Sequence, residues 1–385
     1  MRNSAAEHTL SGETLELPPQ RTRLQEFWSQ LRKNRLALAG LVIFILFFVV
    51  ALTGMLLTTG TSPVLDPSMV RLQEKLRPPL TRANLESLLP EEVPLLRVYV
   101  LGTDELGRDV FARMLQGAWV SLTVGFVAVG LAVIIGVFLG GVSGYYGQSY
   151  IRLGEVILLL LVIWIAVGWS RLSGAYIVII AAVAMFVLVT MLLRRRERSH
   201  RPFSFLEAQL LSVDAMITSL IDIMLCFPSF FLILTVVALL PASIYNIMIV
   251  IGLTSWMGAA RFVRAEFLSL REQDFVTAAR ALGVSDWRII FRHMVPNAIA
   301  PVLVSATIGI AGAILTEAGL SFLGFGVPPP HATWGNILSD GKNYLFDAPW
   351  LTIIPGVAIL VVVLSFNLFG EGLRDILNPK LKERH

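Results

Sequence analysis

The sequence has few of the residues on which disulfide, metal and nucleotide chemistry depend. A single cysteine, Cys226, excludes an intrachain disulfide, and its apolar surroundings predict an inert, buried thiol. The five histidines do not form a metal-ligand spacing. No G-x-x-x-x-G-K-[ST], H-E-x-x-H or G-x-S-x-G pattern occurs. We therefore expect no Walker-type ATP site, no metal site and no enzymatic activity in this chain.

Charge is also scarce. Charged residues make up 15% of the chain and hydrophobic residues 55%, and the mean hydropathy is +0.72, well above that of a soluble domain. Uncharged runs long enough to cross a bilayer recur along the sequence. The fold class is therefore predicted to be an all-α polytopic membrane protein. The net charge of +4 is modest, and basic residues in such a protein first suggest topology signals rather than nucleic-acid binding.

The first part of the chain is predicted to enter the membrane once. Residues 1–35 are polar and form an N-terminal tail, in which 21–35 can make a short interfacial helix. Residues 36–57 are 22 uncharged residues, long enough for a first span and too long for a typical signal-peptide core. Residues 58–118 are a mixed polar loop with several prolines.

Seven further hydrophobic runs bring the predicted number of spans to about eight. They cover residues 119–147, 156–169, 172–193, 213–240, 244–260, 297–316 and 349–370. The run 119–147 is rich in glycine, which allows helices to approach closely in lipid. The run 213–240 contains Asp222, which at membrane depth is expected to be functional or paired, and Pro228, which is expected to kink the helix.

The distribution of basic residues predicts the orientation of the chain. With the N-terminus in the cytoplasm and eight spans, 22 of the 31 lysines and arginines lie on the cytoplasmic side. Seven of the other nine lie in the long loop, which counts less in the positive-inside rule. Both termini and the basic cluster 194–201 are therefore predicted to be cytoplasmic, and Arg171 external.

The longest polar segment in the hydrophobic second half runs from Arg264 to Pro296. Helical spacing puts Leu268, Phe275, Ala279 and Leu282 on one face of a first helix, which Gly283 can end as a left-handed cap. Ser285 can cap a second helix, with Asp286 favourable in its first turn and Trp287, Ile290, Phe291 and Met294 on one face. Pro296 ends this unit or opens the next helix. The apolar faces can pack on the chain's own spans, lie in the lipid interface, or dock into a partner protein.

This segment resembles the E-A-A-x3-G-x9-I-x-L-P loop of ABC-importer permease subunits, through Ala278-Ala279, Gly283 and Pro296. Thr277 stands where that family usually has glutamate, and His293 and Val295 replace the motif's isoleucine and leucine.

Four flanking stretches resemble the dipeptide, oligopeptide and nickel branch of the same family: LGTDELGRD (101–109), IDIMLCFPS (221–229), EAGLSFLGFGVPPP with Trp334-Gly335 (317–335), and FNLFGEGLRDILNPKLK (366–382). In the first stretch, Thr103 and Asp104 suit a turn or a helix start, and Arg108 can pair with Asp104 or Asp109. The family pattern is interrupted at 148–212, which is therefore read as an inserted two-span membrane hairpin.

The resemblance implies a six-span core of the type I ABC importer fold, carried by 119–385 together with the first span. It also implies a cytoplasmic coupling loop at 264–295 and one half of a translocation pathway for di- or oligopeptides. The expected partners are a second homologous permease subunit, two ABC ATPase subunits and an extracytoplasmic solute-binding protein. ATP and Mg²⁺ would be bound by the ATPases, so that this chain needs no cofactor of its own. The location would be the inner membrane of a prokaryote.

The same resemblance assigns roles to particular residues. The coupling loop would use Phe275, Thr277, Ala278, Ala279, Arg280, Gly283, Asp286, Trp287 and Pro296. Asp222 and Glu317 are candidates for the translocation pathway.

Three other functions are alternatives for this sequence. A permease of the same family for nickel, glutathione or a peptide antibiotic would carry the same motifs. A stand-alone secondary transporter would need ion-coupling residues near the midplane, and the few membrane-embedded charges argue against it. An intramembrane enzyme would need a nucleophile–base pair or a metal set, and neither is visible.

Overall fold

The structure is a computed structural model that describes residues 23–61, 63–147, 149–152 and 209–377. Its helices are α1 (Arg23–Lys33), α2 (Arg35–Thr58), α3 (Val110–Tyr146), α6 (Val213–Leu225), α7 (Ser229–Leu239), α8 (Ile244–Leu270), α9 (Asp274–Ala281), α10 (Asp286–Arg288), α11 (Val295–Phe322), α12 (Trp334–Gly341) and α13 (Trp350–Leu377). Short 3₁₀ turns lie at Leu72–Glu74 and Lys342–Tyr344, and a π-helical turn lies at Ile289–Met294. Most of the insertion 148–212, with both predicted spans, lies outside the described residues.

Five helical segments of the described chain are long and apolar enough to cross a membrane: α2, α3, α8, Asp286–Phe322 and α13. The chain is therefore a helical polytopic membrane protein, as its hydropathy predicts. Most of these helices extend beyond the predicted runs, because a helix continues past the hydrocarbon region until a cap or a turn ends it. The clearest case is α3, which begins at Val110 instead of 119. The Asp109 side chain caps it by accepting from the Phe111 backbone N–H at 2.9 Å, so the preceding loop ends at 109 and not at 118.

The predicted span 213–240 is not one kinked helix. It is broken into α6 and α7, which meet at an angle of 81° and count as a sixth span only if taken together. Pro228 stands at the N-cap of α7 and has no backbone N–H with which to continue the helix. Cys226 lies at this break and is exposed, so the prediction of a buried thiol is wrong. The apolar run around Cys226 belongs to the outer surface of the bundle rather than to its core.

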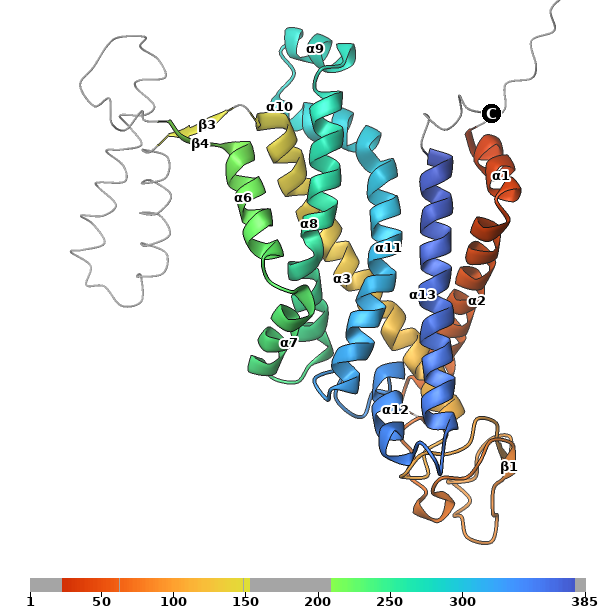
Figure 1. The fold of residues 1–385 in the computed structure, drawn as a ribbon. Helices are drawn as coiled ribbons and strands as arrows, with labels where there is room; N and C mark the ends of the chain where they lie inside the picture. The colour runs from red at the N-terminus through yellow and green to blue at the C-terminus, as the bar shows by residue number, and fades with distance from the viewer. Residues whose placement is uncertain (1–22, 62, 148, 153–208, 378–385) are drawn as a thin grey trace, which may run out of the picture.

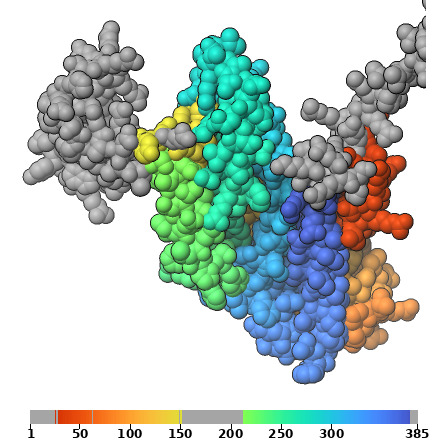
Figure 2. Space-filling view, turned by 45° about the horizontal axis from the view of Figure 1, so that its top comes forward, coloured from red at the N-terminus to blue at the C-terminus, as the bar shows by residue number. Residues whose placement is uncertain are grey.

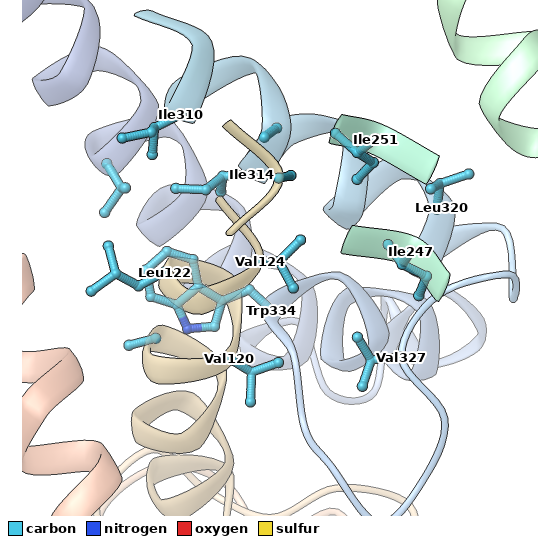
Figure 3. Packing of buried hydrophobic residues seen from close by; sticks show 14 of the residues in the cluster. Val120, Leu122, Val124, Ile247, Ile251, Ile310, Ile314, Leu320, Val327 and Trp334 are labelled. Atoms are coloured by element: carbon cyan, nitrogen blue, oxygen red, sulfur yellow. The ribbon is translucent and has the colours of Figure 1, made fainter. Parts of the chain in front are cut away.

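The central pair of the bundle is α3 and α8, which pack closely along their length (Figure 1). A Cβ at Gly140 of α3 would lie 2.4 Å from the carbonyl oxygen of Ala260 in α8, so only glycine permits this approach. The main core lies around the N-terminal half of α3. Figure 3 shows Val120 and Val124 of α3, Ile251 of α8 and Ile314 of α11 in one cluster with Trp334 at the start of α12.

The two ends of the bundle differ. Figure 1 shows α9, α1 and the end of α13 at one end, and α12 with the loop 59–109 at the other. Two strands at the α9 end, β3 (Tyr150–Arg152) and β4 (Gln209–Ser212), pair antiparallel (Figure 1). The chain therefore leaves for the insertion and returns from it at the same place. A second two-stranded sheet, β1 (Thr81–Arg82) with β2 (Val98–Tyr99), lies within the loop.

Candidate functional site

The connection between α8 and α11, residues 271–294, protrudes from one end of the bundle (Figures 1 and 2). Its helix α9 ends at Ala281, and Gly283, two residues later, has φ +73°. The Val284 N–H donates to the Ala279 carbonyl at 3.1 Å, as in a Schellman cap. Nothing lies within 4 Å of a Cβ built at Gly283, so its left-handed backbone, rather than crowding, favours glycine there.

The second predicted helix is not a separate element. Ser285 stands at the N-cap of α10 but makes no side-chain cap hydrogen bond. The chain passes from α10 through the π-helical turn directly into α11, so the segment Asp286–Phe322 is continuous. Pro296 lies at the start of α11, directly after the π-helical turn, so of the two predicted alternatives it opens the next helix. Leu268, which was assigned to the first helix, belongs to the end of α8.

The structure divides each predicted apolar face of the connection into buried and exposed residues. Val276 and Ala279 are buried in a cluster with Tyr145, Phe267 and Met294. The large apolar side chains that were predicted to share these faces, Phe275, Leu282, Trp287 and Phe291, are instead exposed. Two apolar faces exist on α9, and the one with the smaller side chains packs on the chain's own spans.

The exposed face of α9 carries Phe275, Ala278 and Leu282, at spacings of three and four residues. Leu282 is 83% exposed and lies beside the turn at Gly283. We call these three residues the α9 surface. It is apolar, and it stands at the tip of a protrusion (Figure 2). Such a patch is suited to bind another protein.

A polar cluster ties the connection to the end of α3. The hydroxyl of Tyr145 donates to Asp286 at 2.6 Å and accepts from Arg280 Nε at 3.3 Å, and the Arg280 guanidinium lies 4.8 Å above the same ring. Tyr146 adds a weaker bond to Asp286 at 3.2 Å. Tyr145 therefore joins both halves of the connection, α9 and α10, to a central span. Tyr145 is not among the residues predicted from the sequence, although the Tyr-Tyr pair after a glycine-rich span was a visible signal.

The two pathway candidates have different surroundings. Glu317 is fully buried and accepts hydrogen bonds from Ser321 at 2.7 Å and Ser121 at 3.2 Å. It can reach a pathway only if the surrounding helices move. Asp222 is exposed and pairs with Arg261 of α8 at 2.7 Å. The nearby sequence offered no arginine for this pair, because the partner lies 39 residues away.

A charge network holds the other end of the bundle together. Arg108 pairs with Asp104 at 2.6 Å, one of its two predicted partners, and with Asp340 at 3.1 Å. Arg113 of α3, which is almost fully buried, pairs with the same two carboxylates. The network therefore joins the loop, α3 and α12, and its two arginines balance its two aspartates. Asp109, which caps α3 nearby, is also buried, and burial raises the pKa of its carboxyl above the usual range.

No group of three or more His, Cys, Asp or Glu side chains in the described residues is placed to hold a metal ion.

Comparison with known proteins agrees with this architecture. Residues 208–383 match the family model "Binding-protein-dependent transport system inner membrane component", and residues 22–79 match "N-terminal TM domain of oligopeptide transport permease C". The dipeptide transport system permease protein DppC of Alkalihalophilus pseudofirmus is 35% identical over 93% of this chain and 90% of the relative. Its counterpart in Haemophilus influenzae is 34% identical over 94% and 97%. The oligopeptide transport system permease protein OppC of Bacillus subtilis is 29% identical over 91% and 88%.

The long apolar helices and these similarities define a multi-pass permease of the inner membrane. The chain belongs to the family of binding-protein-dependent transport system inner membrane components, the permease subunits of ABC importers. Permeases of this family work together with other ABC components and are not catalytic themselves.

Proposed function

We propose that this chain is one permease subunit of an ATP-driven importer of di- and oligopeptides and forms half of its translocation pathway. A second homologous permease, two ABC ATPases and an extracytoplasmic binding protein complete the complex, and the ATPases bind ATP and Mg²⁺. The observation that carries the proposal is the exposed apolar α9 surface at the end of the bundle. The names of the relatives favour peptides over nickel, glutathione or a peptide antibiotic.

In this proposal the α9 surface docks into an ATPase subunit, and ATP-driven closure of the ATPases moves it as a rigid body. The motion passes into α8 and α11, which flank the connection, and into α3 through Tyr145. Thr277 weakens the binding to the ATPase relative to a glutamate at this position. Its hydroxyl donates to the Asp274 carbonyl at 2.9 Å, and it offers a partner only a neutral hydrogen bond.

The same proposal places the α9 end in the cytoplasm, together with both termini. The α1 helix and the end of α13 lie at that end (Figure 1). The insertion leaves and returns there through β3 and β4, so it crosses the membrane an even number of times. A two-span hairpin on the periphery of the six-span core satisfies this condition and gives eight spans in all.

The proposal is tested with the tagged chain purified from native membranes and reconstituted with its partners in vesicles. We expect both ATPases and a second permease to co-purify, and the vesicles to take up a dipeptide when binding protein and ATP are present. Purification of the chain alone, with ion-driven uptake, would instead indicate a secondary transporter. In a Cys226→Ser background, Ser173→Cys should be labelled from outside and Ser199→Cys from inside. Equal external labelling would exclude the hairpin.

Tyr145→Phe should uncouple ATP hydrolysis from transport. The substitution keeps the ring that packs in the core and under Arg280, and removes the hydroxyl that bonds to Asp286. A hydrogen bond to a charged group contributes about 1.5–3 kcal/mol, so the dipeptide transported per ATP should fall by roughly tenfold or more while the ATPases still co-purify. Tyr146→Phe is the matched control, since its bond is longer and exposed. An unchanged transport ratio in Tyr145→Phe would contradict this role.

A further inference from the structure

The ion pair between Asp222 of α6 and Arg261 of α8 is exposed on the surface of the bundle. The two side chains meet at 2.7 Å and are 67% and 55% exposed. By contrast, the neighbouring pair of Asp214 and Arg264, near the end of α3, is only 23% and 29% exposed. Most of the surface of Asp222 and Arg261 therefore faces whatever surrounds the chain.

The pair lies towards the cytoplasmic end of α8. Arg261 lies 17 residues after Ile244, the first residue of α8, or about 26 Å along the helix axis. The hydrocarbon region is about 30 Å thick, so a helix that enters it at Ile244 places Arg261 about 4 Å inside the cytoplasmic boundary. An ionised pair at this level needs contact with water, which the interface or a water-filled cavity supplies.

The residues around Asp222 form a polar stripe. Ser219, Asp222 and Cys226 are exposed and follow one another at spacings of three and four along α6. A second exposed stripe of the same helix carries Leu220 and Ile223 and is apolar. The helix therefore has one face suited to lipid and, beside it, one face suited to water.

The adjoining face of α8 is also small and polar. Ser255, Gly258 and Arg261 follow at spacings of three and are exposed. A Cβ at Gly258 would meet nothing within 4 Å, so open space lies over this stripe. Figure 2 shows α6 and α8 side by side on one face of the molecule. The ion pair joins the two stripes into one surface.

We propose that Asp222 and Arg261 form a binding site on the translocation pathway for the charged ends of a zwitterionic peptide. This proposal rests on the proposed function above. Arg261 binds the terminal carboxylate, for which the guanidinium fork is suited, and Asp222 binds the terminal ammonium. When the peptide binds, Arg261 exchanges the carboxylate of Asp222 for that of the peptide, and Asp222 exchanges the guanidinium of Arg261 for the ammonium of the peptide. The desolvation cost is therefore small, and the peptide can both enter and leave.

Water access to the polar stripe provides the first test. Cys226 is the only cysteine of the chain and lies one turn from Asp222, so the native protein carries the probe. In the assembled importer we expect a small, negatively charged methanethiosulfonate to label it, and dipeptide with binding protein to slow the labelling. The control is Ile223→Cys with Cys226→Ser, which moves the thiol to the apolar face and should react far more slowly. Equal reaction, or no reaction of Cys226, would overturn the proposal.

The second test measures dipeptide uptake by the reconstituted importer with Asp222→Asn, Arg261→Gln and the double variant. We expect uptake to fall about tenfold in all three, at unchanged membrane level and subunit composition. A purely structural ion pair predicts recovery in the double variant, because no unpaired charge then remains. Such recovery would overturn the proposal, as would loss of the second permease from the complex. Absence of uptake by the wild-type importer would overturn the proposed function as well, whereas normal uptake by all three variants overturns this inference alone.

Discussion

Leu282→Glu should remove the ATPase subunits from the purified complex without lowering the amount of the chain in the membrane. The leucine side chain is 83% exposed, so a glutamate there is solvated in the free subunit and the fold is unaffected. In the complex the same carboxylate would be desolvated against an apolar partner surface without a counter-charge. We expect ATPase co-purification, measured by quantitative immunoblot, to fall at least about tenfold.

Two further variants define what this result means. Leu89→Glu makes the same change at an exposed leucine in the loop 59–109, and should leave the complex intact. Ala279→Glu cannot serve as a docking test, because Ala279 is only 8% exposed and packs against the chain's own spans. That variant should reduce the level of the chain itself. Normal ATPase recovery with Leu282→Glu would remove the α9 surface from the interface.

The difference between Ala279 and Leu282 shows where the sequence is ambiguous. The α9 helix is apolar on two faces, and hydrophobic periodicity cannot tell which face is covered by the same chain and which by a partner. Helical spacing placed Phe275, Ala279 and Leu282 on one face, whereas the structure buries Ala279 and leaves Phe275 and Leu282 exposed. The positive φ of Gly283 was predicted correctly, because it depends only on local backbone conformation.

The spans could be predicted from the sequence, but the residues at which they end could not. Long apolar runs identify helices such as α2, whose bounds of Arg35–Thr58 differ by one residue from the predicted 36–57 at each end. Ends depend on caps and on breaks, as at Asp109 and Pro228. Ion pairs between segments that are distant in the sequence could not be predicted. Arg113 and Asp340 lie 227 residues apart, and nothing in either local sequence indicates the other.

Arg113→Met should destabilise the bundle more than any surface change. Its guanidinium is nearly fully buried between Asp104 and Asp340, and its removal leaves two carboxylates with Arg108 as their only cation in the network. Loss of one partner from a buried charge network typically costs about 3–5 kcal/mol. In detergent, we expect the midpoint of thermal aggregation to fall by roughly 5 °C or more. Arg82→Met, the same substitution at an exposed arginine of the loop 59–109, should change it little.

A double variant tests whether unbalanced charge is the cause. Adding Asp340→Asn to Arg113→Met restores a network of one cation and one anion, because Arg108 still pairs with the buried Asp104 at 2.6 Å. If the unbalanced charge of the second carboxylate causes most of the loss of stability, the midpoint of thermal aggregation should recover by at least half of its fall. If the lost packing of the arginine stem dominates, the second substitution should lower the midpoint further, because it also removes the ion pair between Arg108 and Asp340. A fall in the midpoint would therefore show that the network holds the loop to α3 and α12 by its shape, and recovery would show that charge balance at this end of the bundle decides its stability.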